Sequence, residues 1–304
     1  MTSRSKSIIK YLVAALLLAV ILRNTNLGKI GSYFAQIPPS HLLLALLFVT
    51  FAQVAAAFRM RYFFRTAGHH LNIKFAIILF YVGAFYNFLL PGGIGGDAYK
   101  VMLARKRLEM PTMEGVKLMV ADRASGLCIV MLILYASLLR IDLSAIIPYA
   151  NFLIAAAAIG TMSAYMLLSK LLLRQPPKGM LLSLPYSLYS QLLWVATIWV
   201  LWDSLGTGTN FIEYVILYCA ASVAGLIPVS VGGLGIKEST YFYGAVLIKK
   251  YTGTPVDGEL GITISLCVFA LSFIASLPGI FWLHKVGNTD MSLLLHHPEE
   301  KAKN

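Results

Sequence analysis

Charged residues are scarce in this chain of 304 residues. Asp, Glu, Lys and Arg together make up 12% of it, whereas apolar residues make up 58%, and the mean hydropathy is +0.75. A soluble domain of this length needs far more charge on its surface to stay in solution. The scarcity of charge therefore excludes a soluble globular fold and predicts an all-α polytopic membrane protein.

Cysteine is also rare, and so are the signatures of catalysis. The three cysteines, Cys128, Cys219 and Cys267, all lie inside apolar segments, where a free cysteine is usually a small buried hydrophobic residue. There is no HExxH, GxSxG or CxxC, and no glycine-rich run ends in GK[ST]. We therefore predict no enzyme activity, no catalytic residue, no cofactor and no metal site.

Acidic residues are about half as frequent as basic ones, 13 against 25, which gives a net charge of +12. Such a balance can indicate nucleic-acid binding, but here the Lys and Arg residues lie in short loops beside apolar segments. In that position they set the orientation of a membrane protein and contact anionic lipid. No basic domain with interleaved aromatic residues is left over, so we predict no nucleic-acid partner.

Long uncharged runs predict the transmembrane segments, because about 20 apolar residues cross a bilayer core of about 30 Å. Basic residues precede the first run, but no small-residue cleavage site follows it, so we interpret it as an uncleaved span. The simple spans are expected at about 8–22, 41–58, 116–139, 149–172, 184–203 and 259–283. With two broken segments counted, the chain has about six to eight transmembrane helices.

Two apolar segments are broken by a proline followed by clustered glycines, at 91–96 and 228–235. Such breaks persist at membrane depth only where protein or a wet cavity satisfies the freed backbone groups. The basic clusters at 59–74 and 100–107 lie on the same, cytoplasmic, side only if the segment 74–112 enters the membrane and returns. We therefore predict a re-entrant hairpin over 74–112.

A second re-entrant hairpin is expected at 211–250, entered from outside, although this leaves Lys249 and Lys250 on the side that basic residues avoid. The two hairpins predict an inverted repeat with halves at about 40–140 and 184–285 in one integral membrane domain, 1–285. Both termini are then cytoplasmic, and 286–304 is a disordered tail. The alternative is eight or nine ordinary spans with two loosely helical loops.

The two breaks also supply the candidate binding site. Clustered glycines before a helix let an anion approach the backbone N–H groups, and phosphate is the anion that a membrane offers in quantity. Charges at membrane depth are costly and therefore indicate function. The predicted headgroup-binding residues are Asn87, Pro91, Gly92, Gly93, Gly95, Gly96, Asp97, Lys100, Asp122, Arg123, Pro228, Gly232, Gly233, Gly235, Lys237 and Glu238.

Plainer roles for these residues remain open. The glycines can serve close helix packing, since Gly92 and Gly96 have the small-xxx-small spacing. Asp122 and Arg123 can bond a neighbouring helix or lie near lipid headgroups. Asp97 and Glu238, each near a helix start, can act as caps. We expect Arg59, Arg61 and Arg65 to be interfacial anchors at the end of a span.

Three ordered motifs in this chain resemble the flippase-like membrane domain of lysylphosphatidylglycerol synthases and its stand-alone relatives. They run from Asn87 to Asp97, from Asp122 to Gly126, and from Ile227 to Glu238, and the resemblance covers about 8–285. It implies a lipid translocator of the bacterial inner membrane, with a phospholipid or an aminoacylated or glycosylated lipid as cargo. Lys100 stands where the family often has arginine, so the charge is kept but a bidentate fork is lost.

Two other functions stay open at this point. The chain can be an accessory membrane subunit that scaffolds a glycosyltransferase or another lipid-modifying enzyme, or it can be a small-solute secondary transporter. The sequence does not indicate the oligomeric state, the direction of transport or its energy source.

Overall fold

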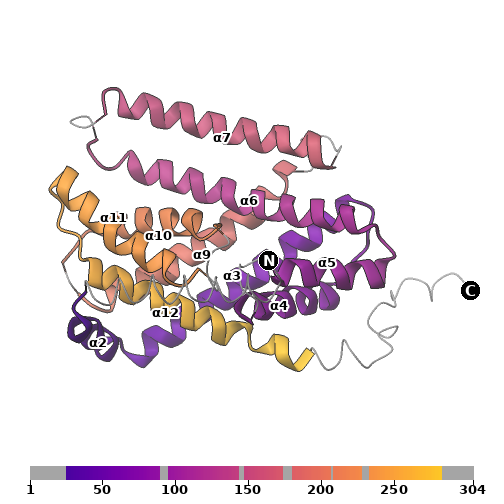
Figure 1. The fold of residues 1–304 in the computed structure, drawn as a ribbon, viewed down its shortest axis with the longest axis horizontal. Coiled ribbons are helices and arrows are strands. Elements are labelled where there is room, and N and C mark those ends of the chain that lie inside the picture. Colours follow the sequence, from indigo (N-terminus) through magenta and orange to yellow (C-terminus); the bar gives the residue numbers. More distant parts are fainter. Residues whose placement is uncertain are drawn as a thin grey trace, which may run out of the picture.

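The computed structural model describes residues 25–89, 95–143, 147–173, 180–206, 208–227 and 233–282, and the regular elements named in these ranges are all α-helices (Figure 1). The all-α membrane class predicted from the composition is confirmed. The expected first span, the cytoplasmic tail and the centres of both glycine-rich breaks lie outside the described residues. The ten named helices are α2 (Leu27–Gln36), α3 (Pro39–Thr66), α4 (Ile73–Leu89), α5 (Gly95–Leu108), α6 (Thr112–Leu138), α7 (Ala150–Leu173), α9 (Leu184–Asp203), α10 (Phe211–Ala224), α11 (Ile236–Thr252) and α12 (Gly258–Ser276).

Five helices of the described part are long and apolar enough to cross a membrane: α3, α6, α7, α9 and α12 with its extension to Trp282. Two other apolar helices are shorter: α4 has 17 residues and α10 has 14. At 1.5 Å per residue, 14 residues reach about 21 Å, less than the hydrocarbon core of about 30 Å. Both short helices end just before a predicted glycine-rich break.

The helices of the two halves follow the same packing order. In the first half α4 packs against α5 and α5 against α6, and in the second α10 packs against α11 and α11 against α12. Figure 1 shows the α4–α5 pair towards one end of the bundle and the α10–α11 pair towards the other. The two halves meet where α3 packs along α9. They also meet at the short helices, since α6 contacts α10 and α12 contacts α4.

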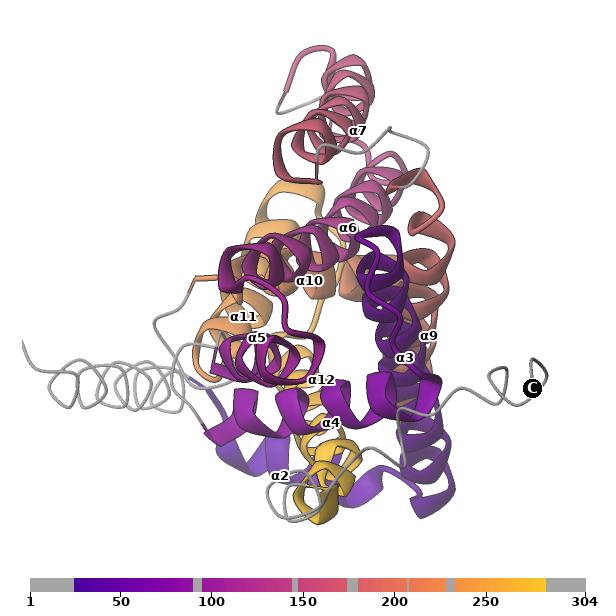
Figure 2. The same ribbon diagram turned by 90° about the vertical axis from the view of Figure 1, so that its right-hand side faces the viewer.

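Two apolar clusters fill the bundle, and α3 contributes to both. Met60, Phe63 and Phe64 of its C-terminal part pack with buried residues of α4, α5 and α6. Ala45 and Val49 of its N-terminal part pack with buried residues of α9 to α12. In contrast, α7 contacts α6 at the edge of the bundle, as Figure 2 shows, and exposes most of its apolar side chains. Exposure of this kind fits a helix that faces lipid.

The backbones of α4 and α5 touch at glycine. The Gly96 amide donates a hydrogen bond to Asn87 Oδ1 at 2.9 Å. A Cβ atom on Gly96 would lie 1.8 Å from the carbonyl oxygen of Gly83, closer than any real contact. Gly96 and Asn87 therefore hold the hairpin together, which is the packing role that the sequence left open for the glycines.

The predicted boundaries at the start of the fold need correction. The uncharged run before Phe58 is divided, because α2 ends at Gln36 and the pair Pro38–Pro39 starts α3, where a missing N–H costs nothing. Nothing in the sequence then breaks the helix before Thr66. The predicted end of this span at residue 58 is therefore wrong, since α3 continues to Thr66 and carries Arg59, Arg61 and Arg65 on its last turns.

The short helix α2 is held against the start of α12 by one acidic residue. Asp257 accepts hydrogen bonds from Lys29 Nζ at 2.6 Å and from the Tyr33 hydroxyl at 2.7 Å, and it caps α12 through the amides of Glu259 and Leu260. Beside these bonds, Ile30 of α2 is buried against Ile262. The polar contacts of Asp257 therefore add to the apolar packing of Ile30 and Tyr33 in holding α2.

This attachment should depend on pH. Burial alone would raise the pKa of Asp257, but the hydrogen bonds from Lys29 and Tyr33 lower it below its ordinary value. A carboxylate with a lowered folded-state pKa stabilises the fold above its ordinary pKa of about 3.9, and the stabilisation is lost as the pH falls through the lowered value. We expect α2 to detach in that acid range.

At neutral pH the Asp257→Asn variant should imitate this loss, because asparagine still caps α12 but cannot pair with Lys29. Since Lys29 is partly exposed, the pair contributes about 1 kcal/mol, and the amides of α2 should exchange with solvent deuterium about fivefold faster. Glu259→Gln is the matched control, since Glu259 lies farther from Lys29, at 3.5 Å. Equal exchange in wild type and Asp257→Asn would contradict the prediction.

Candidate functional site

Three charged residues of the predicted site meet where α5 begins. Asp97, in the first turn of α5, accepts a hydrogen bond from Lys100 Nζ at 3.2 Å and another from Nε of Arg123 on α6. Asp97 and Lys100 are buried. The Lys100 stem crosses Gly83, where a side chain would collide with it, and its ammonium lies 4.6 Å from the centre of the Phe80 ring. Two cations thus share one carboxylate, and this cluster carries a net charge of +1.

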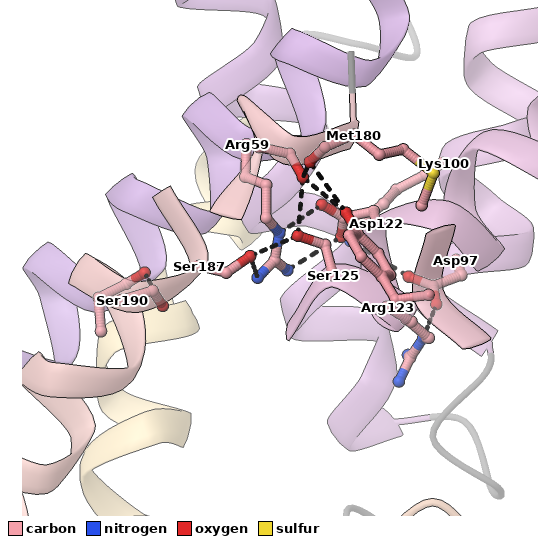
Figure 3. A network of polar contacts seen from close by, with 12 residues as sticks. Arg59, Asp97, Lys100, Asp122, Arg123, Ser125, Met180, Ser187 and Ser190 are labelled. Atoms are coloured by element: carbon pink, nitrogen blue, oxygen red, sulfur yellow. Dashed lines mark hydrogen bonds and ion pairs between the residues drawn. The ribbon is translucent and has the colours of Figure 1, made fainter. Parts of the chain in front are cut away.

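Arg123 is the accessible member of this cluster. Its side chain is 43% exposed, while that of Asp97 is 11% exposed and that of Lys100 is 6% exposed. Figure 3 shows the Arg123 guanidinium pointing away from the buried serines of the network. Because Asp97 binds Nε, it fixes the plane of the guanidinium, which lies at the edge of the cluster. Such a geometry is suited to an anion that approaches from outside the cluster.

The neighbouring residue, Asp122, forms a second and fully buried ion pair. Arg59 of α3 donates from Nε to Asp122 Oδ1 at 2.8 Å and from Nη2 to Oδ2 at 3.2 Å. Gly126 leaves room for the guanidinium, since a Cβ there would lie 3.0 Å from Nη1. The prediction of an interfacial anchor is therefore wrong for Arg59. The plainer role considered for Asp122, a bond to a neighbouring helix, is confirmed.

A chain of hydroxyl groups extends this pair into α9 and α7 (Figure 3). Arg59 Nη1 donates to the Ser187 hydroxyl at 3.2 Å, and Ser187 lies 2.6 Å from the Ser125 hydroxyl. Ser125 lies 2.9 Å from Ser183, which lies 2.8 Å from the Tyr165 hydroxyl. Sequence reasoning missed these residues, although Ser183, Ser187 and Ser190 recur at helical spacing and indicate one polar face on an apolar helix.

At the second break, the acidic residue Glu238 caps the start of α11. Glu238 Oε2 accepts the Gly235 amide at 2.6 Å, and Oε1 accepts the Ser265 hydroxyl of α12 at 2.8 Å. Gly235 has φ +85°, a conformation that favours glycine. The capping role predicted for Glu238 is confirmed, whereas Asp97 binds two cations.

Lys237 lies beside this cap in a space made by glycine. A Cβ on Gly233 would lie 2.8 Å from Lys237 Cε, and one on Gly225 would lie 3.1 Å from it. Lys237 as a residue is neither fully buried nor exposed. Within the described ranges, no carboxylate oxygen lies within 4.0 Å of its ammonium group. The second break therefore presents a cation whose sequence neighbour, Glu238, is already bound elsewhere.

Part of the predicted site cannot be placed. Pro91, Gly92, Gly93, Pro228 and Gly232 lie outside the described residues, so their contact with a headgroup stays a prediction. The same holds for the prediction that the two breaks face each other. The described part of the chain contains no group of three metal-binding side chains.

The fold and this network define a class: a polytopic α-helical membrane protein with charged residues enclosed among apolar helices. Comparison with known families gives the particular family. The chain belongs to the family described as the lysylphosphatidylglycerol synthase TM region, whose family model matches residues 7–279. This membership makes it a membrane protein related to lipid handling. A search of curated proteins found no match.

Proposed function

We propose that the protein moves a lipid between the leaflets of the bacterial cytoplasmic membrane. The pairs α4–α5 and α10–α11 form re-entrant hairpins of an inverted repeat, entered from opposite faces, with both termini in the cytoplasm. The lipid headgroup passes along the charged residues beside the breaks while the acyl chains stay in the bilayer. The chain itself catalyses no reaction, and a partner enzyme supplies the cargo lipid where that lipid is modified.

The observation that carries the proposal is the half-exposed Arg123, oriented by the buried Asp97 beside the start of α5. A charge at bilayer depth costs about 2.5–3.5 kcal/mol on insertion scales, so a charge that stays accessible there indicates a polar ligand or pathway. Short helices interrupted at membrane depth are typical of transporters that bind their cargo near the midplane. The family relation to lipid handling favours a lipid as that cargo.

Leaflet exchange in liposomes tests the proposal. The purified chain is reconstituted with headgroup-labelled phospholipid, and the labelled lipid in the outer leaflet is bleached over time with and without an ion gradient. We expect wild-type protein to accelerate exchange, and Arg123→Gln to slow it at least tenfold, because one charge-assisted hydrogen bond of about 1.5–3 kcal/mol is lost.

Arg65→Gln is the matched control, because Arg65 is an exposed arginine at the end of α3. This variant should exchange lipid at the wild-type rate. If no candidate lipid crosses faster than in protein-free liposomes under either condition, translocation by this chain alone is wrong. Equal rates in Arg123→Gln and wild type would remove Arg123 from the site.

A further inference from the structure

We propose that Glu213 of α10 takes up and releases a proton in each transport cycle, so that a proton gradient drives the movement of lipid. This inference rests on the proposed function and adds its energy source, which the sequence did not indicate. Glu213 is a buried acidic residue outside both the charged cluster around Asp97 and the ion pair of Arg59 and Asp122.

Glu213 is almost completely enclosed, and its carboxylate is poorly bonded. The residue is 3% exposed. Its Oε1 accepts one long hydrogen bond, from Asn210 Nδ2 at 3.5 Å, and its buried Oε2 has no hydrogen-bond partner among the described residues. In the same ranges no Lys or Arg nitrogen lies within 4.0 Å of this carboxylate. Because a buried charge without such partners is costly, the group indicates a bound ion or a functional role.

Apolar side chains on both sides of Glu213 place it inside the bundle. Phe211 and Val215 belong to an apolar cluster with Ile133 and Leu134 of α6. These two α6 residues lie in the last two turns of a helix that is long and apolar enough to cross a membrane. Glu213 is therefore at membrane depth, where acidic residues of pumps and transporters relay protons.

The other buried acidic residues of the described ranges are fully bonded. Asp97 and Asp122 bind cations, and Glu238 accepts a hydrogen bond on each carboxylate oxygen. Glu213 differs from all three because its Oε2 has no donor. A proton added to this oxygen displaces no existing bond, whereas at the other three residues it would weaken a contact that holds two helices or a helix cap.

The position of Glu213 suits a proton that comes and goes. The residue lies in the first turn of α10, where the partial positive charge of the helix start stabilises a carboxylate, while the apolar enclosure makes the charge costly. Neither the charged nor the neutral form is held by a fixed partner. Asn210, which contacts Oε1, is itself exposed and so links the buried carboxylate to the surface.

A proton fits this place better than a metal ion. Hard cations such as Ca²⁺ and Mg²⁺ take about six or more oxygen ligands. The part of the chain that the structure describes contains no group of three metal-binding side chains. Within it, Asn210 is the one side chain that hydrogen-bonds Glu213. A proton needs a single oxygen atom, and Oε2 supplies it.

Other titratable groups gather at this end of α10 without pairing with Glu213. The end of α11 packs here, since Leu217, one turn from Glu213 on the same face, would lie 2.4 Å from a Cβ on Gly244. The start of α12 is here too, because the Tyr214 hydroxyl bonds the backbone of Asp257. The titratable residues of the packed elements at this end are Tyr214 of α10, Tyr135 and Arg140 at the end of α6, Asp203 of α9, Lys249, Lys250 and Tyr251 of α11, Asp257 and Glu259 at the start of α12, and Lys29 and Tyr33 of α2.

The cations in this set are used elsewhere or lie at the surface. Lys29 binds Asp257 and lies 3.5 Å from Glu259. Arg140, Lys249 and Lys250 are exposed. Glu213 therefore remains the buried carboxylate of this region that has no cation.

Lipid exchange under an imposed pH gradient tests the inference. The full chain is reconstituted in liposomes with headgroup-labelled phosphatidylglycerol, and a pH difference is set in either direction while valinomycin and potassium hold the membrane potential at zero. With about two pH units and one proton per lipid, a driving ratio of up to about a hundredfold is available, so we expect one direction to accelerate wild-type exchange about fivefold or more. Glu213→Gln, which keeps the size of the side chain but cannot ionise, should exchange lipid at one rate with and without the gradient.

Glu259→Gln is the matched control, because Glu259 also lies in the first turn of its helix but is nearer the surface and close to Lys29. This variant should respond to the gradient like wild type, and Glu213→Asp, which keeps a carboxyl group, should respond in part. Wild-type exchange that ignores both directions of the gradient, or a wild-type response in Glu213→Gln, overturns the inference. A sodium gradient that drives exchange at constant pH, and loses its effect in Glu213→Gln, overturns the assignment to a proton.

Infrared difference spectroscopy separates this inference from the proposed function, because it detects proton uptake without transport. Lowering the pH of membranes that contain the full chain should produce a carboxylic-acid C=O band that shifts in D₂O and is missing in Glu213→Gln. If this band appears but no lipid crosses under any condition, the proton site stands and translocation fails. If lipid crosses but the band is absent or does not change with pH while the chain stays folded, translocation stands and the proton site is wrong.

Discussion

Replacing Asp122 by asparagine should destabilise the protein more than any change at its surface. The variant leaves the Arg59 guanidinium buried without its carboxylate, and breaking one side of a buried ion pair costs about 3–5 kcal/mol. Ser187, which also bonds Arg59, cannot supply the missing charge. Unfolding in detergent, followed by circular dichroism against denaturant, measures the loss.

The double variant Arg59→Met/Asp122→Leu is the control for this prediction. It removes both charges together, so no buried group is left unpaired, and much of the lost stability should return. If the single and double variants are equally unstable, the loss of stability arises from packing and not from the unpaired charge of Arg59. If Asp122→Asn unfolds like wild type, the pair makes no net contribution to stability.

Replacing Gly96 by valine should prevent α4 and α5 from packing. Even a Cβ atom on this residue would lie 1.8 Å from the Gly83 carbonyl oxygen, which belongs to the backbone and cannot rotate away. The helices must separate, and the hydrogen bond from the Gly96 amide to Asn87 is then lost. Overpacking of this kind costs about 1–3 kcal/mol or more, and we expect loss of lipid exchange with aggregation or lower melting temperature.

Gly160→Val provides the matched comparison, because a Cβ atom on Gly160 of α7 meets nothing within 4 Å. The same change in side chain at this position should leave folding and lipid exchange as in wild type. Intact thermal stability and exchange in Gly96→Val would contradict the close contact between α4 and α5.

The sequence predicted most helices of this fold because their limits have local causes. The segment 74–112 contains the packed helices α4 and α5, and the segment 211–250 contains α10 and α11; that either pair re-enters the membrane stays a prediction. Proline, clustered glycine and the distribution of Lys and Arg mark such breaks in any chain. The capping of α11 by Glu238 is local too, since the residue lies three positions after Gly235.

The sequence did not predict contacts between residues that lie far apart along the chain. Arg59 and Asp122 are 63 residues apart, and nothing in the spacing of either indicates that α3 and α6 bring them together. In sequence, Arg59 resembles Arg61 and Arg65. In the structure, its bonds to Asp122 and the space that Gly126 leaves for its guanidinium distinguish it. The attachment of α2 by Asp257 is likewise a contact across 228 residues, between Asp257 and Lys29. Pairing of this kind is decided by tertiary packing, which a single sequence does not display.

The contact between α12 and α4 has a mechanical consequence. Just beyond α12, a Cβ atom on Gly279 would lie 2.5 Å from the Tyr81 carbonyl oxygen, so these two backbones touch with no side chain between them to yield. On the other side of the bundle α6 contacts α10 in the same crosswise manner. A shift of either short helix is therefore transmitted to a long helix from the other part of the chain, and neither α4 nor α10 can move alone.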